Sequence, residues 1–183
     1  MELRFVDAIK NKDCLKNAKK LYSSAFPIAE RIPFFMLERA CKKDRANFFG
    51  IYDAQTFVGI VYLVLVDDAA LIFYFVVDEK LRGKGYGSAI LSALKEKYPG
   101  TRIFLEIEKP DEHAKNNPER LRRKAFYERN GFVPCGFTTG ALVTYDVLSY
   151  GGAVSINDYR KIMMHFGDSI IFDFVYKKLL KQR

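Results

Sequence analysis

Apolar and polar positions follow two different periods along this chain, and the period distinguishes strands from helices. A short apolar stretch at residues 3–6 predicts a first strand. At residues 13–23 and 35–41, apolar side chains recur every three or four positions, which predicts two helices that each bury one face. Pro27 and Pro33 lie between these stretches and break the helical pattern. The N-terminal quarter is therefore expected to be one strand followed by two helices.

Three apolar-rich runs come next and predict an antiparallel meander. Turns at Asp53-Ala54 and Asp67-Asp68 separate the runs. The predicted strands occupy residues 47–52, 56–66 and 69–77. Helices that are followed by an antiparallel meander are typical of the α+β class.

The rest of the chain mixes strands and helices. The predicted elements are a helix at 87–98, a strand at 102–108, a polar loop at 110–118, a helix at 119–130 ended by Gly131, strands at 132–137 and 141–148, a helix opened by 155–158, and a helix at 168–180. The sequence contains no repeat and no low-complexity linker. Residues 1–183 are therefore expected to form a single α+β domain with a mixed, mostly antiparallel sheet flanked by helices. Residues 155–183 are expected to be a helical C-terminal extension.

Glycines stand at alternate positions where the third strand of the meander gives way to a helix, in the segment Arg82-Gly83-Lys84-Gly85-Tyr86-Gly87-Ser88. Glycine lets the backbone approach a ligand closely, and the unpaired N–H groups of a first helical turn attract anions. The segment therefore predicts a site for a phosphate-bearing cofactor. It is not a Walker loop, because no Ser or Thr follows Lys84, and its third glycine comes one residue too early for a dinucleotide fingerprint.

The spacing Arg-x-x-Gly-x-Gly at residues 82–87 resembles the coenzyme A pyrophosphate loop of the GNAT acetyltransferase superfamily. A second motif agrees with the first. Residues 105–107 (Leu-Glu-Ile) resemble the superfamily's Leu-Glu-Val strand, and Tyr127 with Gly131-Phe132 resembles its Tyr-x-x-x-Gly-Phe helix end. The two motifs together cover about residues 56–140. The chain is therefore identified as a member of this superfamily, with a GNAT-like fold.

The resemblance implies an enzyme that moves an acetyl group from acetyl-CoA to a primary amine, by direct attack in a ternary complex. By resemblance, the strand before the loop pairs with the pantetheine arm and the loop holds the phosphates. The implied cofactor-binding residues are Val76, Val77, Arg82, Gly83, Lys84, Gly85, Tyr86, Gly87 and Ser88.

The resemblance also implies two catalytic residues. Tyr127 falls on the tyrosine that acts as general acid toward the departing thiolate. Glu106 matches the glutamate that serves as general base in ribosomal-protein N-terminal acetyltransferases. Glu108 is a rival base, because strand alternation places it on the same face as Glu106.

Three positions depart from the family pattern. Phe73 stands where many members carry a glutamate base, which excludes that assignment here. Arg120 and Arg123 replace the usual asparagine and small residue ahead of Tyr127, and they leave two alternatives, a contact to cofactor phosphate or plain solvation. The phenylalanine keeps a second function open, that of a non-catalytic domain that binds acyl-CoA as a sensor.

Composition narrows the partners. The formal net charge is +8, but the basic residues are spread over several clusters without an aromatic-interleaved RNA-binding motif, so no nucleic acid partner is expected. The longest apolar run, residues 57–66, is shorter than the roughly 20 residues that cross a bilayer, and the N-terminus is not a signal peptide, so no membrane partner is expected. Three cysteines and two histidines without ligand spacing predict no metal site and no disulfide framework, and a cytoplasmic location.

The acceptor is not specified by the sequence. Residues 26–35 occupy the region that lines the acceptor groove in the family, and Glu30 there is either a ligand for a cationic amine or part of a surface ion pair with Arg31. A small-molecule amine and a peptide N-terminus are both open as acceptors, and so is a homodimer.

Overall fold

The computed structural model of the chain describes residues 1–140 and 143–166. Its strands are β1 (Leu3–Asp7), β2 (Asn47–Asp53), β3 (Thr56–Val66), β4 (Ala69–Val77), β5 (Arg102–Glu108), β6 (Val133–Thr139) and β7 (Tyr145–Tyr150). Its α-helices are α1 (Lys12–Ala25), α2 (Phe34–Lys42), α3 (Tyr86–Lys97), α4 (Asn117–Arg129) and α5 (Ile156–Phe166), with short 3-10 turns η1 (Ile28–Glu30) and η2 (Glu79–Leu81).

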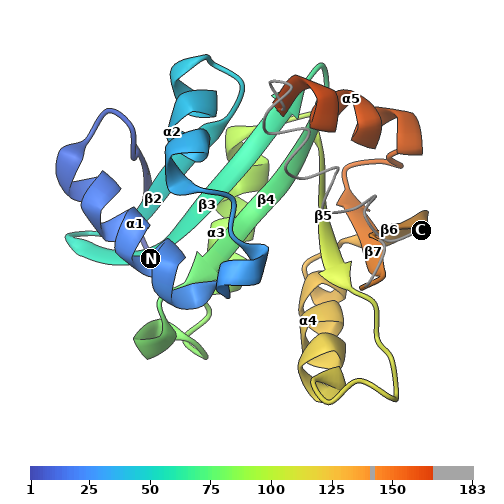
Figure 1. The fold of residues 1–183 in the computed structure, drawn as a ribbon. Coiled ribbons are helices and arrows are strands. Elements are labelled where there is room, and N and C mark those ends of the chain that lie inside the picture. Colours follow the sequence, from blue (N-terminus) through green and yellow to red (C-terminus); the bar gives the residue numbers. More distant parts are fainter. Residues whose placement is uncertain (141–142, 167–183) are drawn as a thin grey trace. The chain divides into compact units, whose positions relative to one another are not determined.

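The strands form one mixed, mostly antiparallel sheet in the order β1-β2-β3-β4-β5-β7-β6 (Figure 1). This confirms the α+β class predicted from the apolar pattern. The chain divides into two compact units. The first comprises Met1–Leu65 and Ile72–Pro99, and the second comprises Val66–Leu71 and the residues from Gly100 onward.

The first unit builds strands β1 to β3 as an antiparallel set. Strand β1 pairs with β2 from Leu3 opposite Asp53 onward, and β2 pairs with β3. Helices α1 and α2 lie in front of these strands in Figure 1, and α3 lies behind them. Asn11 is the N-cap of helix α1, and its side-chain oxygen accepts a hydrogen bond of 2.9 Å from the Cys14 N–H.

Aromatic residues fill the core of the first unit and hold the segment before α2. The rings of Tyr22 and Tyr74 meet edge to face at 4.9 Å. The Tyr22 hydroxyl donates to the Ile32 carbonyl at 2.9 Å, and the Tyr74 hydroxyl donates to the Glu30 carbonyl at 3.1 Å. The two tyrosine hydroxyl groups therefore hold the backbone at residues 30–32 in place, whereas the Glu30 side chain is exposed.

The second unit places β7 between β5 and β6, antiparallel to both. The register sets Glu106 opposite Val147 and Leu105 opposite Leu148. Helix α4 follows β5, and α5 follows β7. Helix α5 belongs to the core, because its residues Ile162, Met163 and Phe166 are all buried.

Two elements of this unit begin two or more residues away from their predicted starts. Helix α4 begins at Asn117 rather than at residue 119, because Pro118 fits its first turn, where a missing N–H breaks no helical hydrogen bond. The strand expected at 141–148 is β7 at Tyr145–Tyr150, whose extent is set by its pairing with Ile103–Glu108 of β5. Residues 141–142 and the helix expected at 168–180 lie outside the described residues.

Candidate cofactor loop and active-site residues

The glycine segment forms the connection from β4 to α3. Gly83 and Gly85 have φ angles of 77° and 83°, in the left-handed region that glycine adopts without strain. Gly85 is the N-cap of α3, so the N–H groups of the first helical turn at Tyr86, Gly87 and Ser88 have no partner within the helix. These donors, at the positive end of the helix dipole, can bind an anion.

The loop is open and carries free positive charge. Residues Arg82, Gly83, Lys84 and Gly85 are all exposed, and no atom beyond the two adjacent residues lies within 4 Å of a Cβ built on Gly83. Within the described part of the chain, neither Arg82 nor Lys84 forms an ion pair. The loop therefore fits the pyrophosphate of coenzyme A, both in backbone shape and in charge.

The side chain of Tyr86 is hydrogen-bonded to Asp53 at the end of β2. Its hydroxyl donates to Asp53 Oδ2 at 2.8 Å, and the carboxylate raises the pKa of the phenol. The side chain therefore ties the start of α3 to the turn that ends β2.

Strands β3 and β4 lie unusually close at the predicted pantetheine site. A Cβ built on Gly59 would lie 2.5 Å from the Val76 carbonyl oxygen and 3.3 Å from Val77 Cα. The Val58 carbonyl accepts a hydrogen bond of 2.9 Å from the Asp78 N–H just beyond. Val76 and Val77 are half-exposed, which leaves them accessible to a ligand. Phe73, in the place of the family glutamate, is also half-buried, with its ring 5.4 Å from that of Tyr74.

Glu106 lies in the middle of β5 and is held by two hydroxyl groups. The Thr139 hydroxyl on β6 donates to Glu106 Oε1, and Tyr159 on α5 forms a second hydrogen bond to the carboxylate. Burial raises the pKa of Glu106, and the two hydrogen bonds oppose this rise. A carboxylate with a raised pKa in a protected place has the properties of a general base.

Glu108 differs from Glu106 although it lies on the same strand. Its Oε1 is 3.1 Å from Arg120 Nη2, and its Oε2 is 3.2 Å from Arg123 Nη1. Asn116 Nδ2 donates to both oxygens at 3.3 Å. The two arginines that depart from the family pattern thus form ion pairs with Glu108.

Tyr127 lies in the last turn of α4 with only 9% of its surface exposed. Its ring contacts those of Phe126 and Phe132 at centroid distances of 5.1 and 5.7 Å. Burial raises the pKa of Tyr127 to about 12, although Arg123 lowers it in part. The phenol therefore stays protonated at neutral pH and can donate a proton.

The structure gathers the predicted residues in two places. The nine cofactor residues lie together in the first unit, and Glu106 and Tyr127 lie in the second unit. Sequence reasoning missed Thr139 and Tyr159, the two partners of Glu106. No local motif marks either residue, and only strand pairing and the packing of α5 identify them.

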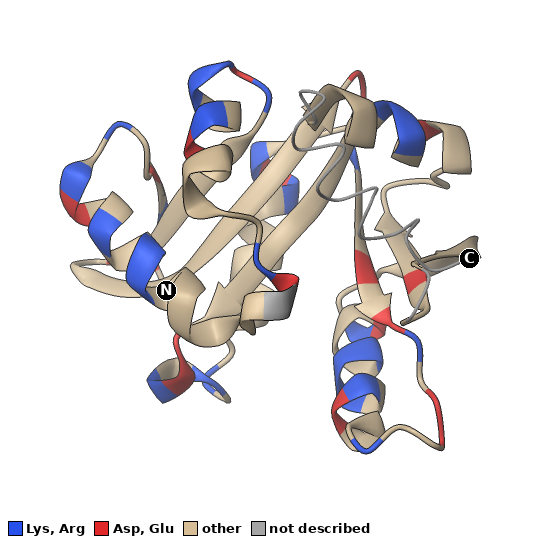
Figure 2. Ribbon diagram, in the orientation of Figure 1, with Lys and Arg blue, Asp and Glu red and all other residues tan. Residues whose placement is uncertain are grey.

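Charge is spread over the surface rather than gathered. Figure 2 shows Lys and Arg on helices α1, α2, α4 and α5 and in the loop before α3, interleaved with Asp and Glu. Within the described residues, no group of three His, Cys, Asp or Glu side chains is placed to hold a metal ion. No helix in the described part of the chain has the length and apolar character that a membrane crossing requires.

Comparisons with known proteins agree with this arrangement. The family model described as an acetyltransferase (GNAT) domain matches residues 44–134, about half of the chain. No curated protein matches. A structure described as a GNAT-family acetyltransferase from Bacteroides thetaiotaomicron has a TM-score of 0.74 and 21% identity, covering 88% of this chain and 93% of its own.

Two further structures share the fold at lower similarity. The ribosomal-protein-S18-alanine N-acetyltransferase of Escherichia coli has a TM-score of 0.59 and 16% identity, over 84% of this chain and 94% of its own. An aminoglycoside 6'-N-acetyltransferase complexed with coenzyme A has a TM-score of 0.59 and 12% identity, over 82% of this chain and 96% of its own. Together, the family match, the fold and the glycine loop show that the chain belongs to the GNAT family of acetyl-CoA-dependent N-acetyltransferases.

Proposed function

We propose that this chain transfers the acetyl group of acetyl-CoA to a primary amine by direct attack in a ternary complex, with Glu106 as base and Tyr127 as acid. The observation that carries the proposal is the state of Glu106. It is a carboxylate with a raised pKa that is held by two hydroxyl groups and, among the described residues, by no cation, unlike Glu108 on the same strand.

The cofactor-binding role falls to the loop and to the end of β4. The first-turn N–H groups of α3, with Arg82 and Lys84, would hold the phosphates. Val76 and Val77, which are half-exposed, would pair through their backbone with the pantetheine arm. Acetyl-CoA supplies the acetyl thioester when it is bound.

Two proton transfers by protein groups must then accompany the acetyl transfer. An alkyl amine has a pKa of about 10.4 and is mostly protonated at pH 7, so a base must accept a proton before the nitrogen can attack. Glu106 accepts that proton, directly or through a water molecule. Tyr127, protonated because burial raises its pKa to about 12, donates a proton to the departing sulfur.

The acceptor belongs to the class of small-molecule amines or peptide N-termini. Proteins that share the fold include, by their names, a spermidine, an aminoglycoside and a ribosomal-protein alanine N-acetyltransferase. These names define three acceptor classes for a screen: polyamines, amino sugars and peptides that begin with alanine.

A non-catalytic acyl-CoA sensor is the second candidate. The half-buried Phe73, in the place of the glutamate base that many members carry, favours it. Such a sensor would bind acetyl-CoA with the same loop and transfer nothing.

The first experiment is a calorimetric titration of the protein with acetyl-CoA, beside Gly85→Glu and Gly100→Glu. Both glycines are exposed and have positive φ angles, 83° and 75°, so the two substitutions add the same charge and similar backbone strain. Gly100 follows the opposite end of α3. We expect saturable binding that Gly85→Glu abolishes and Gly100→Glu preserves.

The second experiment is the amine screen, with thiol release as readout and Glu106→Gln as control. Transfer to one acceptor class, lost in the variant, supports the enzyme. Tight binding without transfer to any class supports the sensor. No binding of acetyl-CoA at millimolar concentration would reject both, because the loop would then be only a helix cap.

A further inference from the structure

The Glu106 carboxylate is held by residues from two elements that lie far from it in the sequence. Thr139 reaches it from β6, and Tyr159 reaches it from α5, beyond the end of the family match at residue 134. The ring of Tyr159 contacts Phe104 and Phe137, each at a centroid distance of 6.4 Å. Ring contacts on two strands fix the direction of its hydroxyl group.

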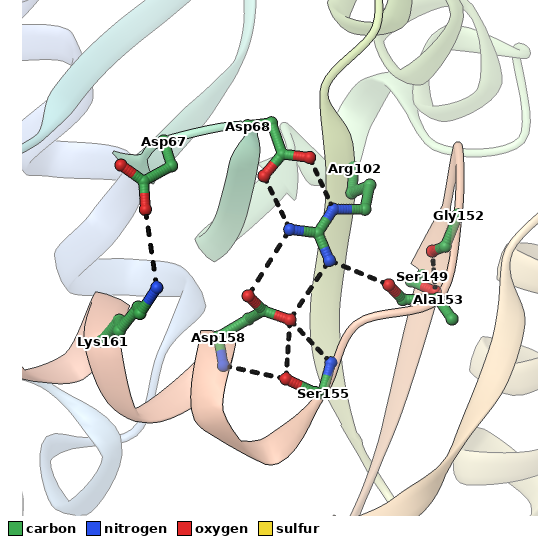
Figure 3. Close-up of polar contacts among 9 residues, drawn as sticks. All are labelled: Asp67, Asp68, Arg102, Ser149, Gly152, Ala153, Ser155, Asp158 and Lys161. Carbon is green, nitrogen blue, oxygen red and sulfur yellow. Dashed lines mark hydrogen bonds and ion pairs between the residues drawn. The ribbon is translucent and has the colours of Figure 1, made fainter.

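Helix α5 is itself fastened by charge. Arg102, at the start of β5, donates to both oxygens of Asp68, at 2.6 and 2.9 Å, and lies 3.1 Å from Asp158 on α5 (Figure 3). Its Nη1 also donates to the Ala153 carbonyl at 2.9 Å. We call Arg102, Asp68 and Asp158 the Arg102 clamp. A guanidinium that engages two carboxylates in this way sets orientation as well as position.

Hydrogen bonds within its first turn also hold the start of α5 in place. The Ser155 N–H donates to Asp158 Oδ2 at 2.9 Å, and the Asp158 N–H donates back to Ser155 Oγ at 3.2 Å. This reciprocal pair is a capping box in which Asp replaces the usual Glu. Lys161, one turn further, lies 3.8 Å from Asp67, as Figure 3 also shows. Helix α5 therefore begins at a defined residue and in a defined rotation.

One face of β5 carries all of these contacts. Strand alternation places Arg102, Phe104 and Glu106 on the same side. Arg102 pairs with Asp158, and both Phe104 and Glu106 contact Tyr159, the next residue of α5. The Arg102 clamp and the hydroxyl contact to Glu106 thus involve neighbouring residues of α5, Asp158 and Tyr159, and the same face of β5.

We propose that Tyr159, with Thr139, is a positioning residue that holds the Glu106 carboxylate in one orientation, and that the Arg102 clamp keeps α5 where Tyr159 can do so. This inference rests on the proposed role of Glu106 as base. A carboxylate accepts about four hydrogen bonds, so two protein donors leave positions for the proton of an incoming amine.

The surroundings of Glu106 explain how Tyr159 affects its proton affinity. Burial raises the pKa of the carboxyl group, and the hydrogen bonds from Thr139 and Tyr159 lower it. From β7, the residue opposite is Val147, and the charge of Glu108 is neutralised by its two arginines. The pKa of Tyr159 is raised by burial and by Glu106, so its hydroxyl remains a donor across the range of an assay.

The test is the pKa of Glu106 in Tyr159→Phe, which keeps the ring and removes only the hydroxyl. It is read from the carboxyl resonance of carbon-13-labelled protein, assigned by its absence in Glu106→Gln. One lost hydrogen bond to a charged group predicts a rise of about one pH unit. Thr139→Val should act in the same direction, and Thr139→Ser, which keeps the hydroxyl, should not. An unchanged midpoint in folded Tyr159→Phe would overturn the proposal.

The clamp is tested by a double-mutant cycle. Arg102→Met should raise the Glu106 midpoint in the wild-type background, and it should add nothing in the Tyr159→Phe background. Asp158→Asn, a milder change to the same clamp, is measured in parallel. Equal shifts in both backgrounds would mean that Arg102 acts on Glu106 without Tyr159, which contradicts the proposed route.

The pH profile of acetyl transfer separates this inference from the proposed function. If both hold, the acid limb of kcat/KM moves upward by about one pH unit in Tyr159→Phe and activity recovers at high pH. A Glu106→Gln protein with full activity would remove Glu106 as base even if the resonance shifts. If Glu106→Gln is inactive but the pH profiles of kcat/KM coincide for wild type and Tyr159→Phe, Glu106 remains the proposed base and only the positioning role of Tyr159 is excluded.

Discussion

Replacing Gly59 by alanine tests how β3 and β4 present the predicted pantetheine site. The added Cβ would lie 2.5 Å from the Val76 carbonyl oxygen, whereas Cβ contacts under 3.0 Å are essentially never observed, so one of the strands must move by at least 0.5 Å. The obstacle is backbone, which cannot rotate away as the end of a side chain can. The displaced residues, Val76 and Val77, are those expected to pair with the cofactor.

Two magnitudes follow from this displacement. Overpacking of this kind costs about 1–3 kcal/mol of stability. Loss of one or two backbone hydrogen bonds to the pantetheine arm, at about 1 kcal/mol each, predicts acetyl-CoA binding that is roughly 5- to 30-fold weaker. In a chain of this length, each kcal/mol lowers Tm by roughly 2–4 °C.

The assay is calorimetric titration with acetyl-CoA at a temperature well below either Tm. Val64→Ala is the matched control, because Val64 is fully buried on the same strand and its truncation costs roughly 2 kcal/mol without adding an atom near Val76. We expect both variants to melt early and only Gly59→Ala to lose affinity. Wild-type affinity in a destabilised Gly59→Ala would refute the assignment of the cofactor to this edge of β4.

Three further results are expected. Tyr127→Phe should lower kcat by about 10²-fold and leave acetyl-CoA affinity unchanged, since it removes a proton donor and keeps the ring packing; unchanged turnover would exclude Tyr127 as the acid. Glu108→Gln should retain activity and lose about 1–3 kcal/mol of stability, because two arginines lose a charged partner; an inactive but stable variant would identify Glu108 as the base. The pKa of Asp158 is lowered to about 2 from its ordinary 3.8, so its stabilisation is complete above pH 3.8 and is lost as the pH falls toward 2. Urea midpoints of wild type and Asp158→Asn should therefore differ above pH 4 and converge in strong acid, and a constant difference would contradict this linkage.

Local pattern was enough to predict most of the fold. Strands β3 and β4 have the predicted bounds, because their apolar runs end at turn residues that the chain cannot build into a strand. The start of α4 was missed because Pro118 looks like a helix breaker but is tolerated in a first turn. The predicted position of β7 was wrong because the ends of this strand depend on its pairing with β5 rather than on its own residues.

The candidate site shows the same division between local and distant information. The glycine loop is contiguous, so its positive φ angles and its place before α3 could be predicted from spacing alone. The environment of Glu106 could not, because its partner Thr139 is 33 positions away and meets it only through the strand order β5-β7-β6. The preference for Glu106 over Glu108 as the proposed base likewise required the arginines of α4, which are distant from Glu108 in the sequence and meet it through the packing of α4 on β5.

The fastening of α5 also bears on where this protein can be cut. A shortened chain that stops near the end of the family match, or after β7, would expose Phe104, leave Arg102 without Asp158 and remove the buried Phe166. Such a fragment would keep every family motif and still lack part of its core. A unit that keeps this core intact therefore reaches at least to residue 166, and relatives that end earlier are expected to stabilise the same strand face by other means.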